Sequence, residues 1–87
     1  MKVRWSETAA SQVEAIYDFI AADNSSAAMA TIDQLFGLTD RLAEFPHLGR
    51  RADAGRRQLI RPPFIFVYRV MEDVVNIEAI FHGSRKY

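Results

Sequence analysis

The spacing of apolar and polar residues changes along the 87-residue chain and divides it into a helical first half and a strand-rich second half. Residues 2–5 alternate charged and apolar side chains, a pattern typical of a short strand with one buried face. From Ser6, a residue type that caps helices, apolar residues recur every three or four positions, which predicts an amphipathic helix. A second helix is predicted from the capping residues 23–26 to Pro46, because proline cannot continue a helix.

Both predicted helices carry one apolar stripe, and the short connection between them predicts an antiparallel helical hairpin. We expect both stripes to pack on a sheet. The stripe residues are Ala9, Val13, Ile16, Tyr17 and Ile20 in the first helix, and Met29, Ile32, Leu35, Phe36, Thr39, Leu42 and Phe45 in the second.

The chain after the second helix shows first no period and then a period of two. Residues 46–56 contain turn formers and charges, which predicts an ordered loop. Strands are predicted over 57–61, 64–71 and 74–81, separated by Pro62-Pro63 and by a tight turn at Glu72-Asp73. In the last strand, alternation places Val75, Ile77, Ala79 and Phe81 toward the helices, and Asn76, Glu78 and His82 on the opposite face.

The predicted order of elements is strand, helix, helix, strand, strand, strand. The first strand must pair within the sheet, because its backbone groups would otherwise lack hydrogen-bond partners. We therefore predict one α+β domain over residues 1–87, with the helical hairpin packed on one face of a small, mainly antiparallel sheet.

The net charge of zero hides an asymmetry between the two halves. Residues 1–45 carry three basic and seven acidic side chains, whereas residues 46–87 carry eight basic and four acidic ones. Arginine suits bidentate contacts with phosphate or carboxylate, so an anionic partner is expected, either nucleic acid or an acidic protein segment. The alternative is that these cations pair with the acidic helices. The candidate binding residues are Arg50, Arg51, Arg56, Arg57, Arg61, Arg69, Arg85 and Lys86.

Several classes of function are excluded by motif and composition. The chain has no cysteine, and its two histidines are isolated, so we expect neither a disulfide nor a metal site. It has no Gly-x-Gly-x-x-Gly, Walker or Gly-x-Ser-x-Gly motif, and no cofactor is expected. Nothing resembles a signal peptide or a membrane-spanning run, so the expected location is the cytoplasm, without a membrane partner.

Candidate catalytic groups lie at the chain end, in the sequence FHGSRKY. A guanidinium can hold a phosphodiester while a histidine or tyrosine moves a proton, which would suffice for metal-independent RNA cleavage through the 2′-hydroxyl. The candidates are His82, Arg85 and Tyr87, expected with Arg61, Arg69 and Lys86 on the open sheet face and its rim. The alternative is a frayed polar tail.

Three other conspicuous side chains have simpler interpretations. Tyr68 in mid-strand is expected in the core with its hydroxyl bonded nearby, and Trp5 is expected in the core as well. His47, beside Pro46, is expected at the surface.

The segments FPHLGRR, RQLIRPPFIFVYRV and VVNIEAIFHGSRKY resemble the RelE/ParE superfamily of bacterial type II toxin–antitoxin toxins over essentially the whole chain. The markers are Pro46, Gly49-Arg50, Arg57-x-Leu59, the aromatic-rich strand 64–70 and the closing His82-Gly83-x-Arg85. The resemblance implies a small toxin held inactive by a cognate antitoxin segment that wraps it, in systems of the plasmid-stabilisation kind. RelE-like members are ribosome-dependent mRNA endoribonucleases, whereas ParE-like members poison DNA gyrase and are not nucleases.

Residue by residue, the resemblance favours the ParE side. Arg85 matches the phosphate-holding arginine of RelE-like enzymes, and Tyr87 lies near the position of their catalytic tyrosine. However, the arginine early in their central strand aligns with Ile65, and the lysine-rich stretch of the archetypal ribonuclease is missing, since this chain has only Lys2 and Lys86. The prediction is a ParE-like toxin that binds DNA gyrase. The alternatives are a RelE-like mRNA endonuclease acting on the ribosome, and a degenerate toxin that still binds its antitoxin.

Overall fold

The computed structural model describes residues 1–83, and the predicted order of elements is confirmed. The segment 46–56, predicted as a loop, also contains a two-residue strand and a short 3-10 helix, because its backbone pairs with the strand that follows. In chain order the elements are β1 (Lys2–Trp5), α1 (Glu7–Ala21), α2 (Ser25–Glu44), β2 (Arg50–Arg51), a 3-10 helix (Asp53–Gly55), β3 (Arg57–Arg61), β4 (Phe64–Met71) and β5 (Val74–His82).

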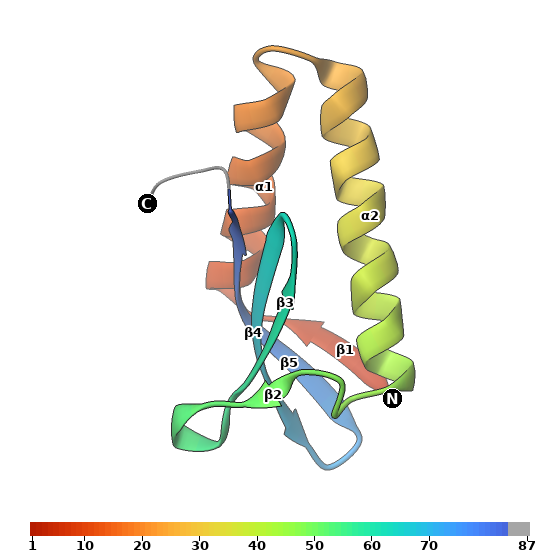
Figure 1. The fold of residues 1–87 in the computed structure, drawn as a ribbon, viewed down its shortest axis with the longest axis vertical. Coiled ribbons are helices and arrows are strands. Elements are labelled where there is room, and N and C mark those ends of the chain that lie inside the picture. Colours follow the sequence, from red (N-terminus) through yellow and green to blue (C-terminus); the bar gives the residue numbers. More distant parts are fainter. Residues whose placement is uncertain (84–87) are drawn as a thin grey trace.

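The five strands form one sheet in the order β1-β5-β4-β3-β2. β1 is parallel to β5 and the other neighbours are antiparallel, so the predicted mainly antiparallel sheet is confirmed. The two antiparallel helices lie together on one face of this sheet (Figure 1). The architecture is therefore a two-layer α+β fold, and within residues 1–83 the second sheet face carries no α-helix (Figure 1).

Both helices begin at the predicted capping residues. The Ser6 hydroxyl oxygen accepts a hydrogen bond from the Ala9 N–H at 3.0 Å, and the Asn24 side chain accepts one from the Ala27 N–H at 3.0 Å. The Ser6 hydroxyl also donates to the Glu78 carbonyl oxygen at 2.9 Å, which joins the start of α1 to β5. Helix α2 ends at Glu44, two residues before Pro46, as predicted.

The core lies between the sheet and the buried sides of the helices, and it includes Tyr68 as predicted. Trp5 is only partly buried and packs against this core. Fully buried side chains include Ile16, Leu35, Leu42, Leu59, Phe64, Phe66, Val75, Ile77 and Ile80.

The predicted stripe of α2 is partly wrong. Met29, Phe36 and Phe45 remain 52%, 45% and 49% exposed. The buried side of α2 is made instead by Ala28, Leu35, Thr39 and Leu42. The apolar residues of α2 cover more than one side of the helix, and only the side that carries the small Ala28 and Thr39 meets the sheet.

The predicted alternation of β5 is wrong beyond Glu78. Val67 pairs with Ala79 and Tyr68 pairs with Ile77, so Glu78 is an extra residue in β5, a β-bulge. An extra residue shifts the alternation by one position. Ile80 and His82 therefore face the helices, and Ala79 and Phe81, predicted to face them, turn to the open side.

Candidate functional site

The open sheet face carries an apolar strip across its three central strands. Ile60 of β3 pairs with Ile65 of β4, which pairs with Phe81 of β5. Opposed residues of paired strands point to the same face, and these three alternate with side chains buried under the helices. Ile60 is 43% exposed. An apolar strip of this kind is suited to contact with another protein.

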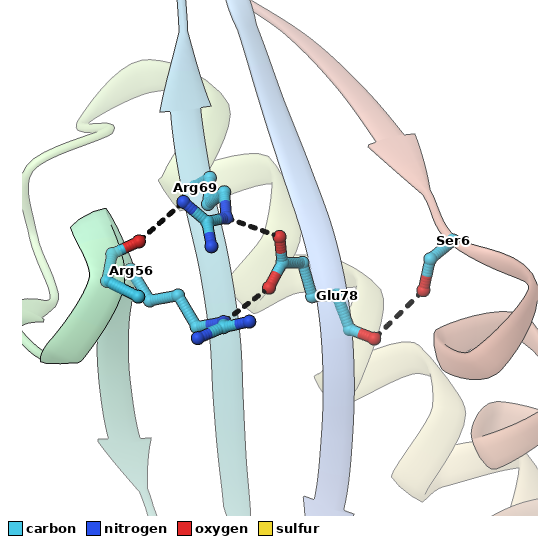
Figure 2. Close-up of polar contacts among 5 residues, drawn as sticks. Ser6, Arg56, Arg69 and Glu78 are labelled. Atoms are coloured by element: carbon cyan, nitrogen blue, oxygen red, sulfur yellow. Dashed lines mark hydrogen bonds and ion pairs between the residues drawn. The ribbon is translucent and has the colours of Figure 1, made fainter.

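A charged cluster centred on Glu78 lies further along the same sheet face, beyond the pair of Val67 and Ala79. Oε1 of Glu78 accepts a hydrogen bond from Nε of Arg56 at 2.7 Å, and Oε2 accepts one from Nε of Arg69 at 2.7 Å (Figure 2). Arg69 also donates from a terminal nitrogen to the Ala54 carbonyl oxygen. One carboxylate on the bulge of β5 thus holds an arginine of β4 and an arginine that follows the 3-10 helix.

The protonation of Glu78 follows from these contacts. Burial raises the pKa of the Glu78 carboxyl, but the hydrogen bonds and charges of Arg56 and Arg69 outweigh burial and hold the pKa below its ordinary value. Glu78 is therefore ionised at neutral pH and offsets the charge of one of its two arginines. An anionic ligand would meet a smaller positive charge here than two arginines alone would present.

The loop after α2 is fixed by Tyr68, as its predicted core position implies. Its hydroxyl accepts a hydrogen bond from the Gly49 N–H at 2.8 Å and donates one to the Pro46 carbonyl oxygen at 2.9 Å. Burial raises the pKa of Tyr68, so the phenol stays protonated and keeps its donor. A Cβ at Gly49 would lie 2.7 Å from the Tyr68 oxygen, so the glycine permits this close approach. His47 in this loop is exposed, as predicted.

The remaining predicted cations do not gather at one point. Arg57 donates to the Gly49 carbonyl oxygen at 2.8 Å, and Arg50 donates to the Gln58 side chain at 2.7 Å. Arg57 and Arg61 pair with residues that face the helices, so the expectation that Arg61 lies on the open face is wrong. Strand alternation from the buried Leu59 is the physical reason. Arg51 and Arg61 are exposed, each at an end of its strand.

His82 faces the helices rather than the open side, because of the bulge at Glu78. Its ring packs edge-on to Phe64, with the ring centroids 5.7 Å apart. Burial lowers the pKa of His82, so the neutral imidazole is favoured at neutral pH. The other proposed catalytic groups, Arg85 and Tyr87, lie outside the described residues, as does Lys86.

The role of Glu78 in organising the open face was not predicted from the sequence. The sequence nevertheless indicates an ion pair between Arg69 and Glu78. The tight turn at 72–73 pairs Arg69 with Asn76, and Glu78 lies two residues after Asn76 on the same strand. Within residues 1–83 no group of three or more acidic or histidine side chains is placed to hold a metal ion. In the same region neither helix is both long and apolar enough to cross a membrane.

Comparison with known proteins agrees with this geometry. Toxin RelE2 of Caulobacter vibrioides is 35% identical over 85 residues, covering 97% of this chain and 97% of that toxin. The fold matches a chain of a chromosomal ParDE toxin–antitoxin system from P. aeruginosa with a TM-score of 0.78 and 25% identity, over 94% of this chain and 95% of that chain. Residues 3–87 match the family described as ParE toxin of the type II toxin–antitoxin system, parDE. The chain therefore belongs to the ParE toxin family within the RelE/ParE superfamily.

Proposed function

We propose that this toxin stops growth in the cytoplasm by binding DNA gyrase, and that its cognate antitoxin prevents this binding. Toxins of type II systems pair with a cognate antitoxin. The chain matches the ParE toxin family. Its resemblance to ParE-like toxins implies DNA gyrase as the target. The proposal concerns the target and the mode of action, which is binding without chemistry.

The observation that carries the proposal is the arrangement around Glu78. Cleavage of a phosphodiester needs cations that stabilise the developing charge and a group that moves a proton. Glu78 instead engages both Arg56 and Arg69, and His82 faces the helices. At Ile65, where RelE-like enzymes carry an arginine, the chain has part of an apolar strip. These features suit a surface that contacts a protein.

A second candidate function is ribosome-dependent cleavage of mRNA. The observation that favours it is the 35% identity to a relative named toxin RelE2. In that case Arg85, Tyr87 and His82 are the catalytic candidates, and Arg50, Arg51, Arg57 and Arg61 would hold RNA.

The test is to induce the chain alone in a bacterium and to follow incorporation of labelled thymidine and methionine during the first minutes. We expect DNA synthesis to fail first, together with a DNA-damage response. In vitro, the purified chain should make gyrase accumulate cleaved plasmid DNA. If protein synthesis fails first and mRNA is cut within ribosomes, the gyrase proposal is wrong and the nuclease candidate is correct.

A variant pair tests the role of the open face. Ile60→Glu places a charge on the apolar strip at an exposed position and should reduce toxicity and gyrase poisoning at least tenfold. Ala30→Glu adds the same charge at an exposed position of α2, away from the sheet, and should leave both unchanged. Circular dichroism verifies that both variants fold. Equal toxicity of the two variants would remove the open face from the mechanism.

A further inference from the structure

The helical hairpin bears an apolar groove that the proposed function does not use. Trp5, Ala10, Val13 and Phe36 line one depression of about 330 Å³. A neighbouring depression of about 400 Å³ shares Val13 and is lined further by Tyr17, Ile32, Glu14 and Asp18. The two depressions therefore form one groove along the seam of α1 and α2, beginning at the end of β1.

Side chains that the core does not use extend this groove along α2. Met29 precedes Phe36 by seven residues, so the two lie on the same side of the helix, about 10 Å apart along its axis. Both are about half exposed, at 52% and 45%. The Phe36 ring is held edge-on by Trp5, with the ring centroids 5.7 Å apart. The Phe36 side chain is thus held in place, and Met29 and Phe36 have the seven-residue spacing at which the anchor residues of helix-in-groove contacts recur.

The rim of the groove is acidic. Glu14 and Asp18 line it from α1, one helical turn apart, and both are exposed. On α2, Asp33 follows Met29 by four residues and Asp40 follows Phe36 by four, so each exposed acid lies one turn beyond an exposed apolar side chain. Across residues 7–44 the sequence contains seven acidic residues and a single basic one, Arg41. The guanidinium of Arg41 lies over the Phe45 ring, beyond the groove.

The acidic rim restricts which partner can bind in the groove. Helices α1 and α2 of a second copy are acidic and would be repelled by this rim. An acidic partner segment would be repelled as well, and it finds its complement in the arginines of the second half of the chain. An amphipathic helix with an apolar stripe and flanking lysine or arginine residues complements this surface, because its stripe can pack in the apolar groove and its cations can pair with the acidic rim.

We propose that the seam of α1 and α2 is a docking groove for a basic amphipathic helix of a partner protein. Its apolar side chains enter between Trp5, Val13 and Phe36, and its cations lie against Glu14, Asp18, Asp33 and Asp40. This surface is separate from the open sheet face. A toxin with both surfaces engages two partner segments of opposite charge at once.

Trp5 provides the measurement, because it lines the groove and is the only tryptophan of the chain. The full chain is titrated with three tryptophan-free 18-residue helical peptides: one with a leucine stripe flanked by lysines, the same peptide with glutamate for lysine, and a scrambled lysine peptide. We expect saturable binding of the first peptide, seen as a change in Trp5 fluorescence, with at least tenfold weaker binding of the other two. Binding should weaken as salt is raised from 50 to about 500 mM, because the contacts at the rim are exposed.

Two charge-reversed variants of the chain complete the test. The double variant Glu14→Lys with Asp18→Lys should bind the lysine peptide at least tenfold more weakly than the unchanged chain does, and it should bind the glutamate peptide more tightly. Asp23→Lys with Asp73→Lys makes the same change of net charge at exposed positions outside the groove and should change binding less than twofold. The proposal is overturned if no peptide changes the fluorescence of Trp5, if the three peptides bind with equal affinity, or if the two double variants bind the lysine peptide equally well. Sedimentation that shows a dimer formed through this seam would overturn it in favour of a second copy. None of these outcomes depends on toxicity or on gyrase.

Discussion

At the scale of single residues, Glu78 has the widest influence on the open face. It is the extra residue of the bulge, its carboxylate holds Arg56 and Arg69, and its carbonyl oxygen accepts from Ser6 at the start of α1. The bulge also turns Phe81 to the open side and His82 to the helix side. The position of Glu78 therefore determines both the charge and the apolar character of this surface.

The contribution of Glu78 to stability should depend on pH. Its pKa is lowered from an ordinary value of 4.5 in the folded state, so the stabilisation is present in full above that value and is lost as pH falls through the folded-state pKa. Glu78→Gln should lower the free energy of unfolding by about 1 kcal/mol at pH 7, a modest figure because the side chains involved are 30–41% exposed. Urea unfolding at pH 7, 5, 4 and 3 measures the difference between the two proteins, which should shrink below about pH 4.5.

Glu72→Gln is the matched control for this prediction. Glu72 is an exposed acid in the β4–β5 turn, and its substitution should change stability little at any of these pH values. A difference between wild type and Glu78→Gln that stays constant from pH 7 to pH 3 would show that the carboxylate charge is not what Glu78 contributes.

At the scale of elements, Tyr68 joins the loop after α2 to β4. Tyr68→Phe leaves the buried Gly49 N–H and the Pro46 carbonyl oxygen without the hydroxyl, which should lower the free energy of unfolding by about 1–3 kcal/mol. Urea denaturation measures this loss. Tyr17→Phe removes a hydroxyl from a half-buried position of α1 and should cost less than about 0.5 kcal/mol. Equal costs for the two variants would contradict the role of Tyr68 in fixing the loop.

The elements were predictable from the sequence where a local signal exists. Ser6 and Asn24 cap the two helices, and Pro46 follows the end of α2, because capping and helix termination act over a few residues. The bulge was not predictable, because an extra residue at Glu78 depends on the pairing of β4 with β5 and leaves no mark in the alternation of β5 alone. For the same reason the sequence predicted the wrong sheet face for His82 and for Phe81. This error affects part of the candidate site.

The orientation of α2 on the sheet shows a second limit of prediction from the sequence. Its apolar residues cover more than one side, and period alone does not identify which side meets the sheet. The structure buries Ala28 and Thr39, while Met29 and Phe36 stay exposed. This part of the fold follows from packing against the sheet, which also leaves the apolar seam open to a partner.

At the scale of the whole molecule, the charge asymmetry of the sequence corresponds to two layers. The acidic residues of the first half lie on the helical layer and the turn between its helices, and the second-half arginines within residues 1–83 lie on the sheet and its loops. The zero net charge therefore describes neither surface. A partner approaching one layer meets the opposite charge from a partner approaching the other, which lets the two layers select different partners.

The two layers should nevertheless unfold as one unit, because they share one core. Ile16 and Leu35 from the helices and Phe66 and Ile77 from the sheet belong to the same buried cluster. Urea unfolding followed by far-ultraviolet circular dichroism, which reports the helices, and by Trp5 fluorescence should therefore give the same midpoint. Ile77→Ala creates a cavity under the helices and should lower both midpoints together, with a loss of about 2–5 kcal/mol. Exposed Ile60→Ala is the control and should shift both midpoints only slightly. If the midpoints separated, the helical hairpin would be stable without the sheet, and docking at its groove would not require the folded toxin.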